Sequence, residues 1–228
     1  MHVEIASIGE QASLLTLGNR IDGDINRRVH ALAGALRGAR IDGMRDIVPA
    51  YASVLLRHGL SAPADVRRWQ SRVREVIAAI DTDDMPDHGT VHRLAVCYDG
   101  ADLEHVAQAC QLSPQDVITR HVRGEYRVAM IGFAPGFPYL IGMDPALATP
   151  RRDSPRTRVP AGAVAIGGSQ TGIYPRTLPG GWHLIGRVDR VLFDADNNEH
   201  PCLLLPGDRV RLHAVDQLGD MHREKASC

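Results

Sequence analysis

The sequence predicts an α+β domain followed by a mainly-β domain. The first part of the chain alternates short apolar runs with two helical patterns, in a ββαββα order that indicates an antiparallel sheet backed by helices. From Arg127 onward, short β-type segments alternate with Gly, Pro and Asp turns, as in a barrel or a sandwich. An acidic, aperiodic stretch over 81–89 separates the two patterns. We therefore expect domains at 1–88 and 89–215, followed by a polar tail at 216–228.

In the first domain, Gly or Pro bounds short apolar runs, which predict strands over 2–7, 12–17, 44–49 and 52–57. The first helix is expected over 24–38 and begins at Asp22 or Asp24, because either side chain can cap it. The second helix has Pro63 in its first turn. Each helix has one apolar face, made of Ile25, Val29, Leu32 and Leu36 in the first and of Val66, Trp69, Val73, Val76 or Ile77, and Ile80 in the second.

The second domain is expected to open with a strand over 91–98, followed by helices over 102–111 and 114–122. Ser113 and Asp116 form a capping box at the second of these helices. The pair imitates a DNA-binding helix-turn-helix, but its second helix begins Pro-Gln-Asp and carries only one arginine. A helical hairpin packed on β-structure is the better interpretation. Later β-type segments are expected over 126–133, 163–168, 183–187, 190–193 and 203–213. In the last of these, PGDRV at 206–210 is expected to be a turn that enters the final strand.

Composition excludes several classes of function. A net charge of −1 lacks the excess of positive charge that is typical of nucleic-acid-binding proteins. The apolar runs are too short for a membrane span, and no charged segment followed by an apolar one opens the chain, so we expect a cytoplasmic protein without a secretion signal. The four cysteines are widely spaced and contain no CxxC pair, which indicates reduced structural thiols and no metal site.

Lysine is nearly absent. Of 26 basic residues only Lys225 is lysine, and it lies in the polar tail. The rest of the chain therefore has no Schiff-base lysine, no P-loop lysine and no lysine base for amidase chemistry. The Gly167–Gly172 segment has the two glycines of a Walker loop without its Lys-Ser/Thr half, so an independent nucleotide-binding loop is excluded.

The most unusual stretch is Gly132–Gly186, which holds ten of the 22 glycines and eight of the 14 prolines. Its aromatic and β-branched residues distinguish it from a disordered linker, so we expect rigid turns between short strands. Four blocks within it read GFAPGFPYL, TPRR, VPAGAVAIGGSQTGIYP and PGGWHLIGR. Together they closely resemble the family of 5-oxoprolinase B subunits (PxpB) or KipI, also called allophanate hydrolase subunit 1, over residues 3–213.

The resemblance implies a small KipI-type N-terminal domain, a cyclophilin-like barrel, and a role as the B subunit of a bacterial ATP-dependent 5-oxoprolinase. In that system the B subunit binds the C subunit directly and acts with the A subunit to open 5-oxo-L-proline to L-glutamate. ATP, with Mg, is used by the assembled complex and is not held tightly by this chain. Two alternatives remain open: a KipI-like inhibitor of a sensor histidine kinase, and a carboxyltransferase or allophanate-hydrolase subunit of urea metabolism.

No complete catalytic set is visible, so we expect this chain to be non-autonomous and to supply part of a composite site. The catalytic candidates are Gln170, His183 and Arg158. The Arg151, Arg152, Arg156 and Arg158 guanidiniums suit carboxylate or phosphate, with Asp153 as a possible local partner. The expected substrate- or ATP-binding residues are Arg156, Arg158, Gly167, Gly168, Gln170, Thr171 and Tyr174.

Aromatic residues on turns predict an interface with another protein chain. Phe133, Phe137, Pro138, Tyr139 and Trp182 are expected to be exposed there, because turns hide large side chains poorly. We also expect the GGSQTG turn to meet the PGGWH turn in space, with Gln170 and His183 as their polar tips.

Overall fold

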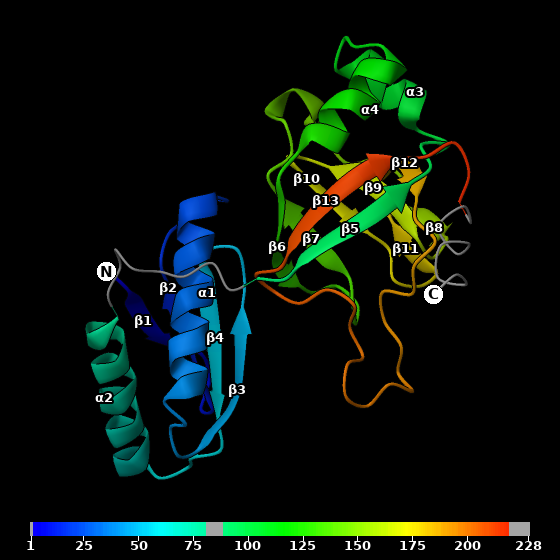
Figure 1. Cartoon of the computed structure of the whole chain (residues 1–228). Coiled ribbons are helices and arrows are strands. Elements are labelled where there is room, and N and C mark those ends of the chain that lie inside the picture. Colours follow the sequence, from blue (N-terminus) through cyan, green and yellow to red (C-terminus); the bar gives the residue numbers. More distant parts are fainter. Residues whose placement is uncertain (1, 81–88, 219–228) are drawn as a thin grey trace. The chain divides into compact units, whose positions relative to one another are not determined.

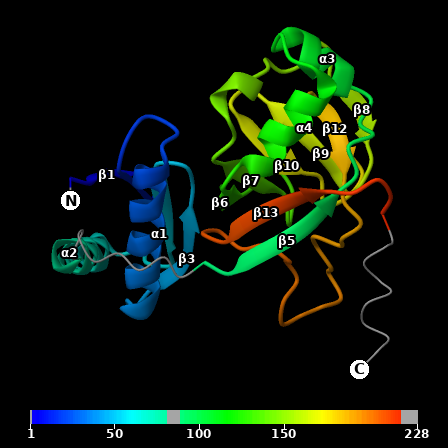
Figure 2. The same cartoon turned by 45° about the horizontal axis from the view of Figure 1, so that its top comes forward.

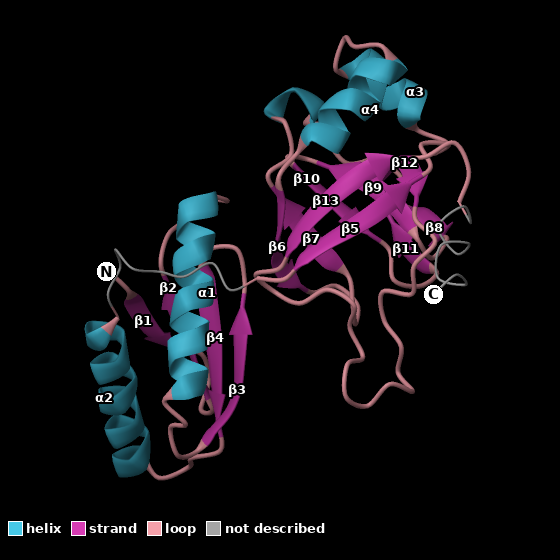
Figure 3. Cartoon of the chain, viewed as in Figure 1, coloured by secondary structure: helices cyan, strands magenta, loops and turns pink. Residues whose placement is uncertain are grey.

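The computed structural model describes residues 2–80 and 89–218. The chain divides into two compact units, 1–88 and 89–228, and each has its own hydrophobic core. The structure is a mixed α/β one, and the second unit holds a nearly closed, barrel-like sheet (Figures 1 and 3). The joint expected over 81–89 lies outside the described residues, apart from Gly89.

The first unit contains four strands and two helices among its described residues. They are β1 (Glu4–Ser7), β2 (Ala12–Thr16), α1 (Gly23–Gly38), β3 (Met44–Pro49), β4 (Ser53–His58) and α2 (Pro63–Ala79). The strands form one antiparallel sheet in the order β1-β2-β4-β3. The bounds of the four strands and of α1 agree with the predicted ranges within two residues.

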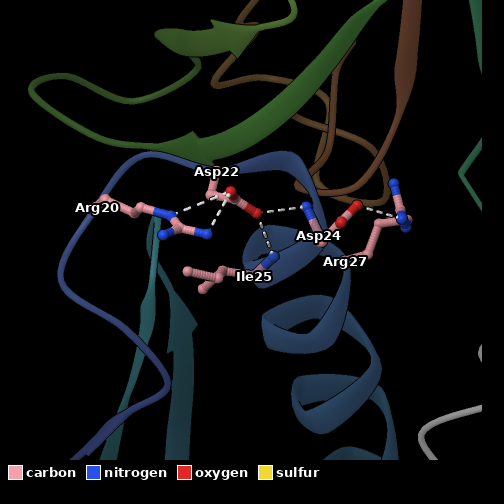
Figure 4. Close-up of polar contacts among 5 residues, drawn as sticks. All are labelled: Arg20, Asp22, Asp24, Ile25 and Arg27. Atoms are coloured by element: carbon pink, nitrogen blue, oxygen red, sulfur yellow. Dashed lines mark hydrogen bonds and ion pairs between the residues drawn. The ribbon is translucent and has the colours of Figure 1, made fainter.

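Helix α1 begins where a carboxylate caps it (Figure 4). The Asp22 Oδ1 atom accepts the backbone N–H groups of Asp24 at 2.9 Å and Ile25 at 3.0 Å, which satisfies two amides of the first turn. The bond from the Ile25 N–H is the main cause that lowers the pKa of Asp22. The sequence left Asp22 and Asp24 as alternatives, and Asp22 is the cap. Asp24 instead pairs with Arg27.

The core of this unit joins both helices to the sheet. The predicted apolar faces supply buried residues from α1 and α2, which pack with buried residues of β2, β3 and β4. The members are Leu15, Val29, Leu32, Ala33, Leu36, Ile41, Ile47, Val54, Leu56, Trp69 and Val73. Side chains repeat their direction every 3.6 residues along a helix and every two residues along a strand. The apolar side of each element therefore faces the same core.

The second unit is built on a seven-stranded sheet in the order β12-β9-β10-β7-β6-β13-β5. Its strands are β5 (Val91–Val96), β6 (Tyr126–Ile131), β7 (Pro138–Ile141), β9 (Ala163–Gly167), β10 (Gln170–Ile173), β12 (His183–Arg187) and β13 (Arg209–Ala214). A separate pair joins β8 (Arg156–Val159) to β11 (Leu178–Gly180). All these pairings are antiparallel except β5 with β13.

An isolated bridge links the two outer strands of this sheet. Cys97, just after β5, exchanges two backbone hydrogen bonds with Arg187 of β12, at 3.0 and 2.9 Å. Farther along, the Asp102 N–H donates to the Leu184 carbonyl at 2.8 Å. These contacts bring both edges together, so the sheet closes on itself and protects its edge strands.

Helices α3 (Leu103–Ala109) and α4 (Pro114–Arg123) cover one end of the barrel, near the β12 and β13 ends (Figures 1 and 2). The Ser113 hydroxyl accepts the Asp116 N–H at 3.1 Å, as the capping box predicts. A short 3-10 turn, η1 (Pro145–Leu147), follows β7. No helix in the described parts of the chain has the length and apolar character to cross a membrane.

One predicted strand is wrong. Residues 190–193 form no strand and contribute only an isolated bridge between Phe193 and Cys202. The apolar run is too short to decide between a strand and a packed loop, and Leu192 is buried from a loop. The Gly/Pro-rich stretch contains the short strands β7, β8, β10 and β11, whose individual positions the sequence did not resolve.

Candidate functional site

Three of the sequence motifs converge in the second unit. Strands β9 and β10 form a hairpin around Gly168 and Ser169, and Gly168 has the positive φ of +63° that its loop position favours. Gly168 exchanges backbone hydrogen bonds with Thr149 of the TPRR block, and the Arg152 N–H donates to the Gly181 carbonyl at 2.8 Å. TPRR therefore ties the GGSQTG turn to the PGGWH turn.

The predicted meeting of the GGSQTG and PGGWH turns is confirmed. A Cβ atom on Gly167 would lie 2.5 Å from the Trp182 ring, so only glycine permits this approach. Gly168 is one of the residues expected to bind substrate or ATP, but its N–H donates to the Thr149 carbonyl at 2.7 Å. Gly167 and Gly168 therefore shape the junction between the turns.

Behind the turns lies a cluster of aromatic rings centred on Phe137. Its ring centroid is 4.9 Å from Tyr139, 5.2 Å from Tyr174 and 5.7 Å from Trp182. Tilted and edge-to-face contacts of this kind add to the stabilisation from burial. Tyr174 is 2% exposed, and burial raises the pKa of its hydroxyl. Its hydroxyl would lie 2.1 Å from a Cβ on Gly180, so the ring is packed against the turn.

The expected exposure of the aromatic set is wrong for most of its members. Phe137, Pro138 and Trp182 are buried in the core of this unit, and Tyr139 is half-buried. The glycines at 167 and 172 leave room for the Trp182 and Phe137 rings, which explains how turn residues become internal. Phe133 is 59% exposed and has a left-handed φ of +65°. It is the member of the set that presents a large apolar surface.

Thr171 belongs to a buried polar network and not to the surface. The Thr171 hydroxyl donates to the Ala165 carbonyl at 2.9 Å and accepts from His121 Nε2 at 3.0 Å. The Tyr98 hydroxyl, in turn, donates to His121 Nδ1 at 2.8 Å. These partners fix a neutral imidazole with its proton on Nε2, and burial lowers the pKa of His121 to about 3. The predicted ligand role of Thr171 is therefore replaced by a role in the core.

Gln170 begins β10 and pairs with Gly167 across the hairpin. The residue is 9% exposed. Its amide makes no hydrogen bond to any residue in the described parts of the chain. An amide carries two donors and an acceptor that are costly to leave unpaired when buried. Gln170 therefore remains a candidate for contact with a ligand or a partner.

The arginine-rich segment is organised by a carboxylate that sequence reasoning missed. Arg156 Nη2 donates to Asp102 Oδ1 at 2.8 Å, and Arg152 Nη1 donates to the same oxygen at 3.2 Å. The other carboxylate oxygen accepts the Leu184 N–H at 2.7 Å. Asp153, the partner that the sequence suggested, is exposed and forms no ion pair with a described residue.

Burial alone would raise the pKa of the Asp102 carboxyl, but the Arg156 hydrogen bond, the Leu184 N–H and both guanidiniums outweigh it and hold that pKa below its usual value. Asp102 is therefore ionised at neutral pH.

The other two arginines of the segment do not contact Asp102. Arg151 lies over the Trp182 ring at 5.8 Å. Arg158 is exposed and has no ion pair with a described residue, so its guanidinium group is accessible to a ligand.

His183 lies in the same region and is 4% exposed. Its Nε2 atom donates to the Pro150 carbonyl at 2.8 Å, and its ring stacks on the exposed His105 ring at 4.7 Å. The Nδ1 atom is buried without a partner among the described residues. His183 is therefore held as a lining residue, and Nδ1 is its only ring nitrogen free to act on a ligand.

Two cavities of about 390 and 430 Å³ lie away from this region, one in each unit. The first is lined by Asp116, Thr119, Arg120, Arg123, Gly124, Glu125, Gly142 and Asp144, and the second by Ala39, Arg40, Ile41, Asp42, Leu60, Asp65, Arg68, Trp69 and Arg72. Neither cavity contains a residue that the sequence predicted for the site. The candidate residues therefore line neither of these two cavities.

The fold and this surface define the class. A family model described as "Carboxyltransferase domain, subdomain C and D" matches residues 3–204. The chain is 39% identical to the B subunit of 5-oxoprolinase from Bacillus subtilis (strain 168), over 97% of this chain and 96% of that relative. It is 41% identical to the B subunit of 5-oxoprolinase from Escherichia coli O157:H7, over 90% and 92%. The chain therefore belongs to the family of 5-oxoprolinase B subunits.

A solved structure gives the same fold within a longer chain. The crystal structure of TTHA0988 is similar with a TM-score of 0.79 and 40% identity, over 91% of this chain. The match covers 40% of that chain, so this chain spans about two fifths of that protein.

Proposed function

We propose that this chain is the B subunit of a bacterial ATP-dependent 5-oxoprolinase, which acts with the A and C subunits to hydrolyse 5-oxo-L-proline to L-glutamate. The observation that carries the proposal is the near-complete match to two curated 5-oxoprolinase B subunits. The surface supports it, because its polar groups converge without a nucleophile–base pair of their own. The proposed enzyme class is a hydrolase of cyclic amides, of which this chain is a non-autonomous part.

We propose the following chemistry for the complex. Transfer of the ATP γ-phosphoryl group to the lactam oxygen makes the ring carbon more electrophilic. Water then adds to that carbon, the C–N bond breaks, and the ring nitrogen takes a proton to become the amine. A second water releases phosphate from the resulting acyl phosphate. The balance is one ATP and two waters consumed for one glutamate, one ADP and one phosphate.

The residues of this chain do not by themselves fit a nucleotide–magnesium site. No group of three His, Cys, Asp or Glu side chains in the described parts of the chain is placed to hold a metal ion. The Gly168 N–H, which could have faced a phosphate, is used by Thr149. We therefore assign ATP and Mg to the assembled complex, with the C subunit as the direct partner and the A subunit as the third component.

Within that complex Gln170 is the proposed donor to the lactam oxygen, because its amide has no partner among the described residues. Arg158 supplies an exposed guanidinium for an anionic group. His183 contributes through Nδ1 as polar lining. Phe133, at the exposed end of the aromatic cluster, is the proposed contact with another chain of the complex. The remaining aromatic residues hold that contact in place from the core.

For the domains we propose a ββαββα KipI-type unit at 1–88, a cyclophilin-like barrel at 89–215 and a polar tail at 216–228. We also propose that the protein works in the cytoplasm.

The test is reconstitution of the purified chain with its A and C partners, with glutamate formation from 5-oxoproline and ATP as the readout. We expect no turnover by the isolated chain and robust turnover by the complex. Replacing Gln170 by Ala should lower kcat by about 10²–10³, because a donor to a developing oxyanion contributes on that scale. Arg158→Lys should also lower activity, because lysine keeps the charge and loses the planar fork.

Arg211→Gln, on the exposed side of β13, is the matched control and should leave the rate unchanged. Two results would contradict the proposal: turnover by the isolated chain, or a complete wild-type complex that forms no glutamate. Unchanged turnover in a folded Gln170→Ala complex would remove Gln170 from the mechanism.

A further inference from the structure

Two guanidiniums in the barrel unit share one carboxylate oxygen. Arg152 and Arg156 both donate to Oδ1 of Asp102, whose side chain is 6% exposed. Two positive charges and one negative charge leave this cluster with a net charge of +1. No further acidic partner is recorded for either arginine in the described parts of the chain. Because like charges held together repel, a second anion would stabilise the pair.

The hydrogen bonding of the cluster is also incomplete. Arg152 Nε and Arg156 Nη1 are buried, yet neither has a partner among the described residues. Buried donors in folded proteins are nearly always paired, and unpaired ones call for a missing water or ligand. The side chains are still 34% and 24% exposed, so a small anion can reach the guanidiniums from solvent.

The backbone fixes all three members. Arg152 is held by its N–H on the Gly181 carbonyl, and Arg156 by strand pairing with Gly180. Asp102 exchanges hydrogen bonds with Leu184, one from its own N–H and one to its carboxylate. An arrangement anchored in this way loses little conformational freedom when a ligand binds.

From this geometry we propose that Arg152 and Arg156, positioned by Asp102, form the seat for the carboxylate of the cyclic amide substrate. The proposal rests on the proposed function and names the part of the substrate that this chain binds. A carboxylate is the favoured anion because its single charge matches the net charge of +1, whereas a triphosphate would leave most of its charge unpaired. Its two oxygens also suit two separate N–H donors.

The test compares variants in the reconstituted complex. Arg152→Gln brings the cluster to neutrality while Asp102 keeps both Arg156 and the Leu184 N–H, so the fold should persist. We expect KM for 5-oxoproline to rise at least tenfold, with KM for ATP unchanged. Arg152→Lys keeps the charge and should lose less. Arg211→Gln is the matched control and should leave both KM values unchanged.

Equilibrium binding to the same complex without ATP separates this proposal from the proposed function. Wild-type complex should bind 5-oxoproline and bind 2-pyrrolidinone, which has the lactam but no carboxylate, at least tenfold more weakly. Arg152→Gln should remove that preference. A wild-type complex that shows the preference but forms no glutamate would overturn the proposed function alone. Equal preference in wild type and Arg152→Gln would overturn the proposed carboxylate site. So would an Arg152→Gln variant that raises KM for ATP and leaves KM for 5-oxoproline unchanged.

Discussion

Two polar clusters in the barrel unit differ in how completely they are satisfied. The His121 cluster is buried and neutral, and both ring nitrogens have partners in Thr171 and Tyr98. The Asp102 cluster carries a net charge of +1 and leaves buried donors on both arginines unpaired among the described residues. Burial of polar groups is common to both, so burial alone does not mark function. Unpaired donors next to an excess of charge distinguish a cluster that awaits a ligand from one that is complete.

The largest expected effect comes from breaking the complete cluster. His121→Ala removes the acceptor of the Tyr98 hydroxyl and the donor to Thr171, and it leaves a cavity. Each unpaired buried group costs about 1–3 kcal/mol and the cavity adds to that, so we expect a loss of about 3–5 kcal/mol of unfolding free energy. Urea denaturation measures it. His200→Ala, at an exposed position, should change stability by less than about 0.5 kcal/mol. A loss below about 1 kcal/mol in His121→Ala would show that the network is not a stabilising core element.

Asp102→Asn should have a smaller effect on stability, with a different response to anions. The change removes the counter-charge of two part-exposed guanidiniums, so we expect a loss of about 1–3 kcal/mol. Added acetate should restore part of the thermal midpoint, because the cluster then has a net charge of +2. The same acetate should give His121→Ala no rescue. If acetate shifts Asp102→Asn no more than wild type, the guanidiniums do not bind carboxylate.

The smallest expected change is the change in unfolding free energy per pH unit. It also distinguishes the two clusters most clearly. Burial lowers the pKa of His121 to about 3, below its unfolded value near 6.5, so the unfolded state binds more protons between these values. Stability from this group is complete above about pH 6.5 and falls as pH drops, by at most about 1.4 kcal/mol per pH unit. Asp102 also has a lowered pKa, but its contribution is complete above about pH 3.8 and is lost only below that.

The difference between wild type and His121→Gln isolates this effect. Unfolding free energies at about pH 7.5, 6.5, 5.5 and 4.5 should converge as pH falls, since only wild type carries the buried imidazole. Asp102→Asn should run parallel to wild type over the same range. A constant difference between wild type and His121→Gln would mean that the pKa of His121 is the same in the folded and unfolded states, so that burial does not lower it.

Local patterns in the sequence located most elements. The apolar faces of α1 and α2 and the Ser113 capping box depend on residues within one or two helical turns, and the structure has them where the patterns place them. The cap of α1 is Asp22, one of the two residues that the sequence offered. The four blocks between Gly132 and Gly186 also identified the family, which the comparisons confirm. The expected strand at 190–193 failed because a short apolar run serves equally well as a packed loop.

Most elements outside the Gly/Pro-rich stretch, the family, and the meeting of the GGSQTG and PGGWH turns could be predicted from the chain. Each of these follows from sequence neighbours or from a motif of consecutive residues. Which side chains face a ligand depended on long-range packing. That packing buried Phe137 and Trp182 where glycines at 172 and 167 made room, and it closed Thr171 into the His121 network. It also brought Asp102 to Arg152 and Arg156 across 50 and 54 residues. An ion pair over that separation depends on how β12 packs beside the start of α3, and no local pattern encodes that contact.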